Sequence, residues 1–237
     1  MKRFLKHAVS LLLVVCLIAA LGCTAFAIEA EQDTIPFTDV SEDSWYYHDV
    51  YTAYHLGLMN GMTDTTFAPE ETMTRAMLVM VLYRIAGEDP EAVYPSSNFA
   101  DVPANTWYTQ AVNWAADCGI AFGTDPEHFR PNESVNRQQA VTFFFRLASN
   151  YCWKSLMGDT EVPWDNSHRA DLSKYVDCSH VQEYAVEAFQ WAVANSIVDG
   201  IPSDDSATLS PSNSATRAQL SAIAVRFEAH INSMINL

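Results

Sequence analysis

The sequence predicts an all-α protein in which three helix-loop-helix repeats form one pseudo-threefold helical bundle. The first indication is a repeated segment: FTDVSEDSWYYHDV at 37–50 returns as FADVPANTWYTQAV at 99–112, sixty-two residues further on. The second is a helical spacing of apolar residues in each copy, and the third is a long apolar segment that follows a helix-capping residue. A fixed internal period of this kind is typical of folds built from copies of one supersecondary unit.

The first two copies align without a gap, and a third, more diverged copy starts at YVDCSHVQEYAVEAFQWA. We expect repeat 1 at 37–90, repeat 2 at 99–149 and repeat 3 at 175–231. The segment 150–174 separates the second and third copies and holds two tryptophans in polar surroundings. We interpret it as an ordered surface insertion and a possible contact for a protein partner.

Each repeat opens with a predicted amphipathic helix. Apolar or small residues recur at steps of 4, 3 and 4, which places them on one helical face. The positions are 46, 50, 53 and 57, then 108, 112, 115 and 119, then 185, 189, 192 and 196. Gly57 and Gly119 suit the end of this helix and a tight reversal of the chain.

A second helix is predicted to begin at Thr74, Asn136 and Thr216, which are all good N-cap residues. The residues that follow are apolar on most sides of a helix, as in AMLVMVLYRIAG. Such a helix is buried among neighbours. One unit of about 55 residues hardly buries two helices alone, so we expect the three units to pack into one body.

Three arginines are the sharpest candidates for a binding function: Arg75, Arg137 and Arg217. Each lies in the first turn of the second helix, where the helix dipole disfavours a cation. A helix start together with a guanidinium suits a carboxylate or phosphate ligand. The alternative is that each arginine pairs with an aspartate of the chain. The candidate aspartates are Asp39, Asp101 and Asp177.

The ordered motifs of the three copies resemble the S-layer homology (SLH) domain. They are the FxDV start, the WY pairs, the turns GLMNG, GIAFG and SIVDG, the FxP element, and TRAM, NRQQ and TRAQ. The family usually has Glu at the last position of TRAM, where this chain has Met77, Gln139 and Gln219. Gln still completes a capping box and Met does not, so this chain departs from the family pattern.

The resemblance implies a non-catalytic module that anchors a protein to secondary cell-wall polysaccharide, often a pyruvylated one, in grooves between repeats. It implies that the three arginines hold a carboxylate and that Gly61, Gly123 and Gly200 let sugar approach the backbone. It also implies that Trp45 and Trp107 pack on a sugar face, although a tryptophan at a helix start also serves as a hydrophobic plug. The three aspartates either accept sugar hydroxyls or cap the first helix.

A second series of arginines follows nine residues after the first: Arg84, Arg146 and Arg226. We expect these side chains to run along the bundle and to pair with acids.

The amino terminus reads as a secretory signal peptide over 1–27, with a basic start, an apolar run and an AFA cleavage site before Ile28. The alternative is a lipoprotein signal at Cys23. A short segment, 28–36, precedes repeat 1. Residues 1–27 hold three of the 13 basic residues and none of the 29 acidic ones, so the remainder carries 10 against 29, a net charge of −19. This charge disfavours nucleic acid as a partner, and no later segment is apolar enough to span a membrane.

No catalytic, metal or cofactor pattern is recognised in the sequence. The three cysteines after the signal peptide, Cys118, Cys152 and Cys178, are spaced unlike a disulfide framework, and we expect buried thiols. The sequence therefore predicts a secreted, non-enzymatic protein of the cell wall or cell surface that binds wall polysaccharide. The alternative is a secreted scaffold that binds a protein.

Overall fold

The computed structural model describes residues 34–152, 168–203 and 206–235. The predicted signal peptide, the Cys23 alternative and most of the 150–174 insertion lie outside these residues. Residues 35–237 form one compact body, as expected of three units that share a core. No helix among the described residues has the length and apolar character needed to cross a membrane.

The described residues are mainly helical, which confirms the all-α prediction. The first unit supplies α2 (Tyr47–His55) and α3 (Arg75–Ile85), and the second supplies α4 (Thr109–Asp117) and α5 (Arg137–Arg146). The third supplies α7 (Glu183–Ala194) and α8 (Arg217–Ile235). A π-helical turn at Leu147–Cys152 continues α5, and 3-10 turns lie at Leu172–Lys174 and Cys178–His180.

One small feature was not predicted. Strands β1 (Ile201–Ser203) and β2 (Ser206–Thr208) pair antiparallel and form a hairpin within the third unit. The hairpin occupies the loop between α7 and α8, where the third copy needs insertions to align with the others. Pro202 and the short length of both strands leave no alternating apolar pattern that predicts a strand.

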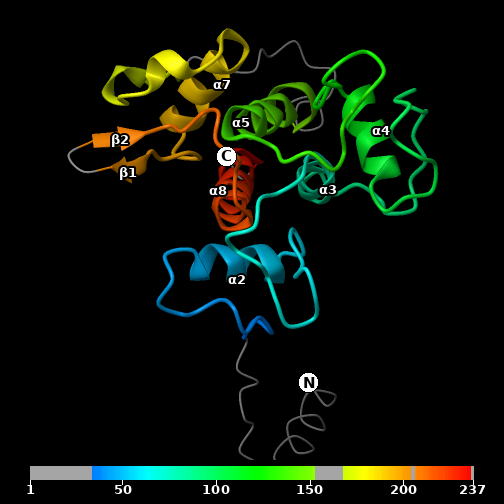
Figure 1. The fold of residues 1–237 in the computed structure, drawn as a ribbon, viewed down its shortest axis with the longest axis horizontal. Coiled ribbons are helices and arrows are strands. Elements are labelled where there is room, and N and C mark those ends of the chain that lie inside the picture. The colour runs from blue at the N-terminus through cyan, green and yellow to red at the C-terminus, as the bar shows by residue number, and fades with distance from the viewer. Residues whose placement is uncertain (1–33, 153–167, 204–205, 236–237) are drawn as a thin grey trace, which may run out of the picture. The chain divides into compact units, whose positions relative to one another are not determined.

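The helices of successive units pack on one another in a closed ring. Helices α3, α5 and α8 lie toward the middle of the body, with α2, α4 and α7 outside them (Figure 1). Each outer helix packs on the inner helix of the preceding unit: α4 on α3, α7 on α5, and α2 on α8. Each unit therefore completes its core only with a neighbour, which is why the three do not behave as separate beads.

A ring of backbone hydrogen bonds joins the units just before the inner helices. The amide of Met73 donates to the carbonyl of Ala215 at 3.0 Å, that of Ala215 to Val135 at 2.9 Å, and that of Val135 to Met73 at 2.9 Å. All three residues are buried. Buried backbone groups must be paired, and here each unit can satisfy its own only through the next.

The predicted N-caps are confirmed at all three inner helices. The side chains of Thr74 and Asn136 accept the amides of Met77 and Gln139, and Asn136 with Gln139 forms a complete capping box. In the third unit Thr216 accepts the amide of Gln219 at 3.2 Å.

The next two amides of each inner helix are bound by the neighbouring unit. In α3, for example, the amide of Arg75 donates to Glu133 at 2.9 Å and that of Ala76 to Pro131 at 3.0 Å. The sequence interpretation had these amides exposed and ready to grip an anion together with the arginine. That expectation is wrong, because backbone carbonyls of a neighbouring unit already occupy them.

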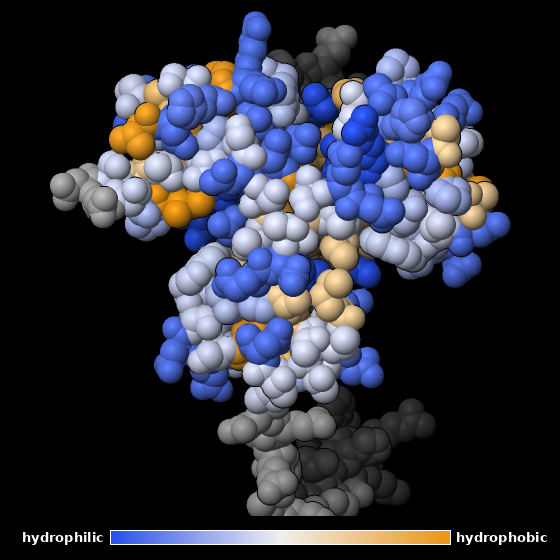
Figure 2. All heavy atoms as spheres, viewed as in Figure 1, coloured by the Kyte–Doolittle hydropathy of each residue, from blue (hydrophilic) through white to orange (hydrophobic). Residues whose placement is uncertain are grey.

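The outer helices end as predicted. Gly57 and Gly119 adopt φ of +69° and +66°, the left-handed conformation that glycine tolerates best. Ser196 takes the equivalent place in the third unit with φ of +56°. The expectation of buried thiols is wrong for Cys118 and Cys178, which are half-buried. The face of the body shown in Figure 2 is mainly hydrophilic, and its apolar side chains form small, separate spots.

Candidate functional site

Arg75, Arg137 and Arg217 lie at the boundaries between units and are almost fully buried, with 3%, 4% and 5% of their surface exposed. The Nε atom of each donates to a backbone carbonyl of a neighbouring unit: Arg75 to Phe129 at 2.8 Å, Arg137 to Leu209 at 2.8 Å, and Arg217 to Phe67 at 2.7 Å. The alternative in which each arginine pairs with an aspartate is therefore wrong for the Nε atoms, which donate to carbonyl groups instead. The arginines join units through carbonyl groups.

Two of these arginines make a second bond across the boundary. The Nη2 atom of Arg75 donates to the carbonyl of Phe122, and that of Arg217 donates to the carbonyl of Asn60, both at 2.7 Å. The guanidinium groups of Arg75 and Arg217 also lie 4.6 and 4.5 Å from the ring centres of Phe129 and Phe67, a cation–π arrangement.

Burial lowers the pKa of all three groups. It lowers the pKa of Arg137 and Arg217 to about 10, and it lowers that of Arg75 as well. All three side chains are still cations at neutral pH. The carbonyl dipoles compensate for part of the lost hydration, which explains how a buried charge is tolerated at a helix start.

Asp39, Asp101 and Asp177 have a structural task that the sequence did not reveal. The carboxylate of Asp39 accepts the amides of Phe67 at 2.8 Å and Ala68 at 2.7 Å. The other two accept the equivalent pairs at the same distances, Asp101 from Phe129 and Arg130, and Asp177 from Leu209 and Ser210. The expectation that these aspartates cap the first helix is wrong.

The aspartate and the arginine therefore clamp one turn from two sides. Asp39 binds the amide of Phe67, and Arg217 of another unit binds its carbonyl. The residue after Phe67, Ala68, adopts φ of +59°, a strained conformation for alanine that these bonds help to hold. These bonds fix the position of each inner helix relative to the next unit.

Gly61, Gly123 and Gly200 are required by the packing of the chain itself. A Cβ atom at Gly61 would lie 2.3 Å from the carbonyl oxygen of Thr63 and 2.5 Å from the ring of Phe37. At Gly123 the nearest atom would be the Asp125 carbonyl oxygen at 2.4 Å, and at Gly200 the Tyr175 ring at 2.5 Å. Packing within the protein therefore requires glycine at all three positions, and the close approach of a sugar to these residues stays a prediction.

The same residues nevertheless meet in three surface grooves, and each groove is built from all three units. We number each groove by the unit that supplies its glycine. Groove 1 combines Gly61 and Arg84 with Trp107 and Arg217 and has a volume of about 150 Å³. Groove 2 combines Gly123 and Arg146 with Tyr184 and Arg75 and measures about 390 Å³. Groove 3 combines Gly200 and Arg226 with Trp45 and Arg137 and measures about 440 Å³.

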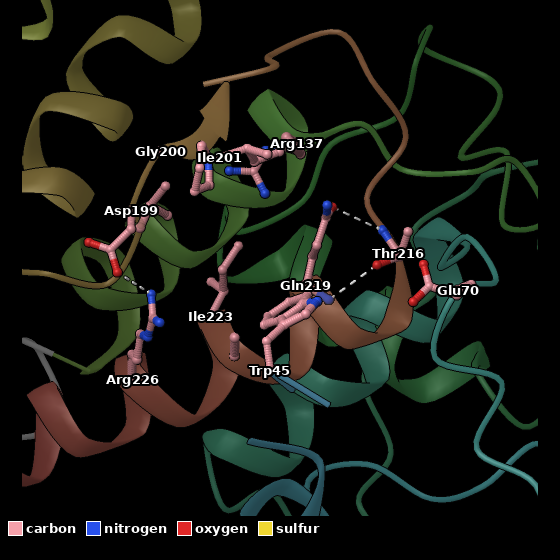
Figure 3. Close-up of a pocket in the computed structure, with 13 residues that line it drawn as sticks. Trp45, Glu70, Arg137, Asp199, Gly200, Ile201, Thr216, Gln219, Ile223 and Arg226 are labelled. Carbon is pink, nitrogen blue, oxygen red and sulfur yellow. Dashed lines mark hydrogen bonds and ion pairs between the residues drawn. The ribbon is translucent and has the colours of Figure 1, made fainter. Parts of the chain in front are cut away.

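An exposed aromatic residue borders each groove. Trp45 is 64% exposed, Trp107 is 58% exposed and Tyr184 is 46% exposed. The alternative of a hydrophobic plug is wrong for both tryptophans. Figure 3 shows Trp45 over α8 in groove 3, with Arg137 and Arg226 in the same lining. An aromatic face open to solvent beside cations is a surface that a sugar ring can cover.

The second series of arginines belongs to the grooves, a role that the sequence interpretation underestimated. Arg226 pairs with Asp199 at 2.8 Å, as the sequence predicted for this series (Figure 3). Arg84 donates to the carbonyl of Leu58 at 3.1 Å, and Arg146 lies 4.8 Å from the ring centre of Phe122. Burial lowers the pKa of Arg84 and Arg146. The sequence held two signals for these groove residues. The arginines recur at one repeat position, and Tyr184 takes the place in the third copy that Trp45 and Trp107 hold in the first two.

Each groove thus presents two guanidinium groups in a chain whose formal net charge is −16. The charge of the whole surface repels anions at long range, whereas the arginines that line grooves 1 and 2 attract one at short range. In groove 3 Glu70 and Asp199 lie beside the two arginines, and Asp199 pairs with Arg226. The arrangement suits a ligand that carries a single acidic group next to an apolar ring face.

Comparison with known proteins identifies what this chain is similar to. The S-layer homology domain model matches residues 36–76 and 98–141, within the first two units. A cell surface protein of Thermoanaerobacter kivui is 34% identical over 48% of this chain and 15% of its own length. An endoglucanase of Bacillus sp. (strain KSM-635) is 27% identical over 91% of this chain, and the surface-layer 125 kDa protein of Lysinibacillus sphaericus is 25% identical over 86%.

The chain spans only 21% of that endoglucanase and 16% of that surface-layer protein. The similarity to the endoglucanase therefore concerns a small part of that enzyme. S-layer homology domains are non-catalytic modules that attach proteins to the cell surface. The third unit stays a predicted repeat, supported by the equivalent bonds of Asp177 and Arg217. Residues 36–76 and 98–141 thus match the S-layer homology domain, and the chain is similar to surface-layer and other cell-surface proteins.

Proposed function

We propose that the protein binds acidic secondary cell-wall polysaccharide, without covalent attachment, through grooves 1, 2 and 3. The observation that carries the proposal is the threefold recurrence of one constellation: two guanidinium groups and an exposed aromatic side chain in a groove between units. Guanidinium binds carboxylate by charge-assisted hydrogen bonds. A carboxylate on a sugar, of which a pyruvate ketal is one form, matches this pair of cations.

The two arginine series take different parts in this proposal. Arg75, Arg137 and Arg217 are buried to the point that only a small part of each guanidinium meets a ligand. Of the five donors of a guanidinium, the bonds described for Arg75 use two. The first series thus forms the floor of the grooves, and Arg84, Arg146 and Arg226 with the aromatic residues form the walls. The aspartates and glycines act on the ligand only by shaping these walls.

Three grooves on one compact body favour a polymer over a single sugar. A polysaccharide repeats the same acidic unit, so a second groove binds at a high effective concentration once the first is occupied. This argument also gives the proposal a location: the predicted signal peptide directs the chain out of the cell, where the polymer is.

The test is co-sedimentation of the full chain with isolated cell walls, before and after chemical extraction of the secondary polymer. The variants are Trp45→Ala, Trp107→Ala and Tyr184→Ala, singly and combined. Trp45 and Trp107 are more than half exposed and Tyr184 is 46% exposed, so the fold is expected to survive, which circular dichroism checks. The control is Val93→Ala/Val176→Ala. These two side chains are 84% and 65% exposed and line none of the three grooves.

Wild type and the valine control are expected to pellet with walls that retain the polymer and to stay in solution with extracted walls. The triple aromatic variant is expected to stay in solution with both. Equal sedimentation of the triple variant and wild type contradicts the groove assignment. Equal sedimentation with extracted walls contradicts the polymer as ligand and favours a protein-binding scaffold.

A further inference from the structure

Groove 3 differs from the other two grooves in the charge of its lining. Two acids, Glu70 and Asp199, lie there beside the cations Arg137 and Arg226, so the formal charges cancel. Grooves 1 and 2 each have two arginines in their lining, and no Asp or Glu is among the described residues that line them. Only in grooves 1 and 2, therefore, does a ligand meet a pair of cations without acids beside them.

Asp199 holds the cation of groove 3 that is more open to a ligand. The Nη1 atom of Arg226 donates to the carboxylate of Asp199 at 2.8 Å (Figure 3). The Arg226 side chain is 38% exposed, whereas Arg137 is buried and donates through Nε to the carbonyl of Leu209. A carboxylate of the chain therefore makes the charge-assisted bond that a ligand carboxylate would make.

A second carboxylate acts on the same guanidinium. Burial raises the pKa of Asp49 in α2, and the charges of Arg226 and His48 lower it. Helix α2 packs on α8, which carries Arg226. Arg226 thus has acidic neighbours in two elements, and less of its charge is left for a ligand.

The partners described for the equivalent arginines of grooves 1 and 2 are neutral. Arg84 donates to a backbone carbonyl at 3.1 Å, and Arg146 lies 4.8 Å from the ring centre of Phe122. Asp199 stands directly before the glycine of its groove, a position held by Asn60 in the first unit and by Phe122 in the second. An acid at this position is therefore peculiar to the third unit.

The rest of groove 3 also suits an uncharged ligand. Beside the exposed Trp45, its lining includes four aliphatic side chains: Val198, Ile201, Ala222 and Ile223. Ile201 begins β1 and follows Asp199 by two residues, so one loop supplies both the acid and part of the apolar wall. A carboxylate that enters this groove loses water and finds its cation already paired, which costs free energy.

We propose that Asp199 determines the specificity of groove 3 by holding Arg226 in place of a ligand carboxylate. Groove 3 takes an uncharged sugar of the wall polymer against Trp45, and grooves 1 and 2 hold the acidic sugars. This inference rests on the proposed function and divides it between the grooves.

The test compares single grooves in the full chain. Trp107→Ala/Tyr184→Ala removes the aromatic walls of grooves 1 and 2 and leaves groove 3, whereas Trp45→Ala/Tyr184→Ala leaves groove 1. The probes are secondary wall polysaccharide purified from a Gram-positive bacterium with an S-layer, and the same preparation after chemical reduction of its carboxyl groups to alcohols. Titration calorimetry at pH 7 measures the affinity for both, and circular dichroism and the urea midpoint check that each variant is folded.

The protein with groove 3 alone is expected to bind the acidic probe no more tightly than the reduced probe. With Asp199→Asn added, it is expected to bind the acidic probe about fivefold more tightly than the reduced one. That factor corresponds to about 1 kcal/mol, the upper range for an exposed ion pair, at about 1.4 kcal/mol per factor of ten. Asp43→Asn removes the same charge at an exposed residue that lines none of the grooves, and it is expected to leave the ratio of affinities unchanged.

The reciprocal exchange is Asn60→Asp in the protein with groove 1 alone. Asn60 is exposed, lines groove 1 and precedes Gly61 as Asp199 precedes Gly200. The protein with groove 1 alone is expected to prefer the acidic probe. Asn60→Asp is expected to lower that preference about fivefold, because it places a carboxylate beside Arg84 as Asp199 stands beside Arg226.

Two results overturn the assignment of Asp199 and leave the anchoring function standing. One is a preference of groove 3 for the acidic probe as strong as that of groove 1, and the other is the absence of any shift toward the acidic probe in Asp199→Asn. An equal shift in Asp43→Asn also overturns it, because the effect then belongs to the net charge. If wild type does not bind the acidic probe, the proposed function fails and this inference fails with it.

Discussion

Replacing Arg75 with alanine is expected to destabilise the fold strongly, and more than replacing Arg137. The two arginines occupy equivalent positions in α3 and α5, and both are buried. Arg75 makes two hydrogen bonds to carbonyls of the next unit, at Phe129 and Phe122, whereas one such bond is described for Arg137, to Leu209. The pair therefore separates the effect of the second bond, together with the contacts of Arg75 to the rings of Phe129 and Phe143, from the effect of losing a buried guanidinium.

The magnitude follows from the number of bonds. A hydrogen bond with one charged partner contributes about 1.5–3 kcal/mol, so Arg75→Ala loses about 3–6 kcal/mol and Arg137→Ala about half as much. The cost of burying the guanidinium, which lowers the pKa of both arginines, is relieved in both variants and favours the lower values. We expect about 3 kcal/mol for Arg75→Ala and about 1.5 kcal/mol for Arg137→Ala. For a chain of this size, 1 kcal/mol shifts the melting temperature by about 2–4 °C.

The assay is urea unfolding followed by tryptophan fluorescence, with thermal unfolding followed by circular dichroism. Arg130→Ala is the control, because Arg130 is exposed and its ion pair with Glu133 at 2.9 Å lies on the surface, where such pairs contribute about 0–1 kcal/mol. If Arg75→Ala unfolds at the same urea concentration as Arg130→Ala, the arginine is not the lock between units that we describe. Equal losses for Arg75→Ala and Arg137→Ala refute the count of bonds. The same reasoning makes a double Ala replacement of the two arginines a poor probe of binding, since loss of binding and loss of fold coincide.

Three further outcomes are expected. Gly61→Ala should lower the free energy of unfolding in urea by about 2 kcal/mol or more, because its Cβ would lie 2.3 Å from a carbonyl oxygen. Gly57→Ala, at φ of +69° in open space, should lower it by about 1 kcal/mol. A larger loss for Gly57→Ala contradicts the packing argument. Burial raises the pKa of Asp49, so its ionised form disfavours the folded state, and Asp49→Asn should raise the melting temperature at pH 7 by an amount that shrinks as the pH falls toward 3.8; a pH-independent difference rules this out. Met77→Gln should complete a capping box with Thr74 and add about 0.5–1 kcal/mol, and no gain in the urea midpoint would show that the cap is already satisfied.

The helical repeat was visible in the sequence because it depends on local chemistry. Gly57 ends a helix whatever surrounds it, and Asn136 with Gln139 caps one through atoms three residues apart. Apolar spacing marks the buried face of each helix in the same local way. These features need no knowledge of which unit touches which.

The arginines show where local reasoning stops. The sequence indicated that Arg75 stands at an unfavourable place in a helix and must have a compensating partner. It proposed a ligand or an aspartate, because charged groups are the partners that a sequence displays. The partners described here are backbone carbonyls 47 and 54 residues away, and every residue has a carbonyl, so no residue type announces them.

The grooves are a consequence of tertiary structure for a geometric reason. Arg84 recurs at one repeat position, and Trp45, Trp107 and Tyr184 share another. This repeat pattern does not indicate that Trp107 lies beside Arg84 and Arg217, which belong to two other units. Their meeting follows from the cyclic exchange in which each outer helix packs on the inner helix of the preceding unit. Local patterning thus accounts for the helices, their caps and their count, whereas the grooves and the inter-unit locks arise only when the chain closes on itself, because contacts between distant segments carry no signature in residue order.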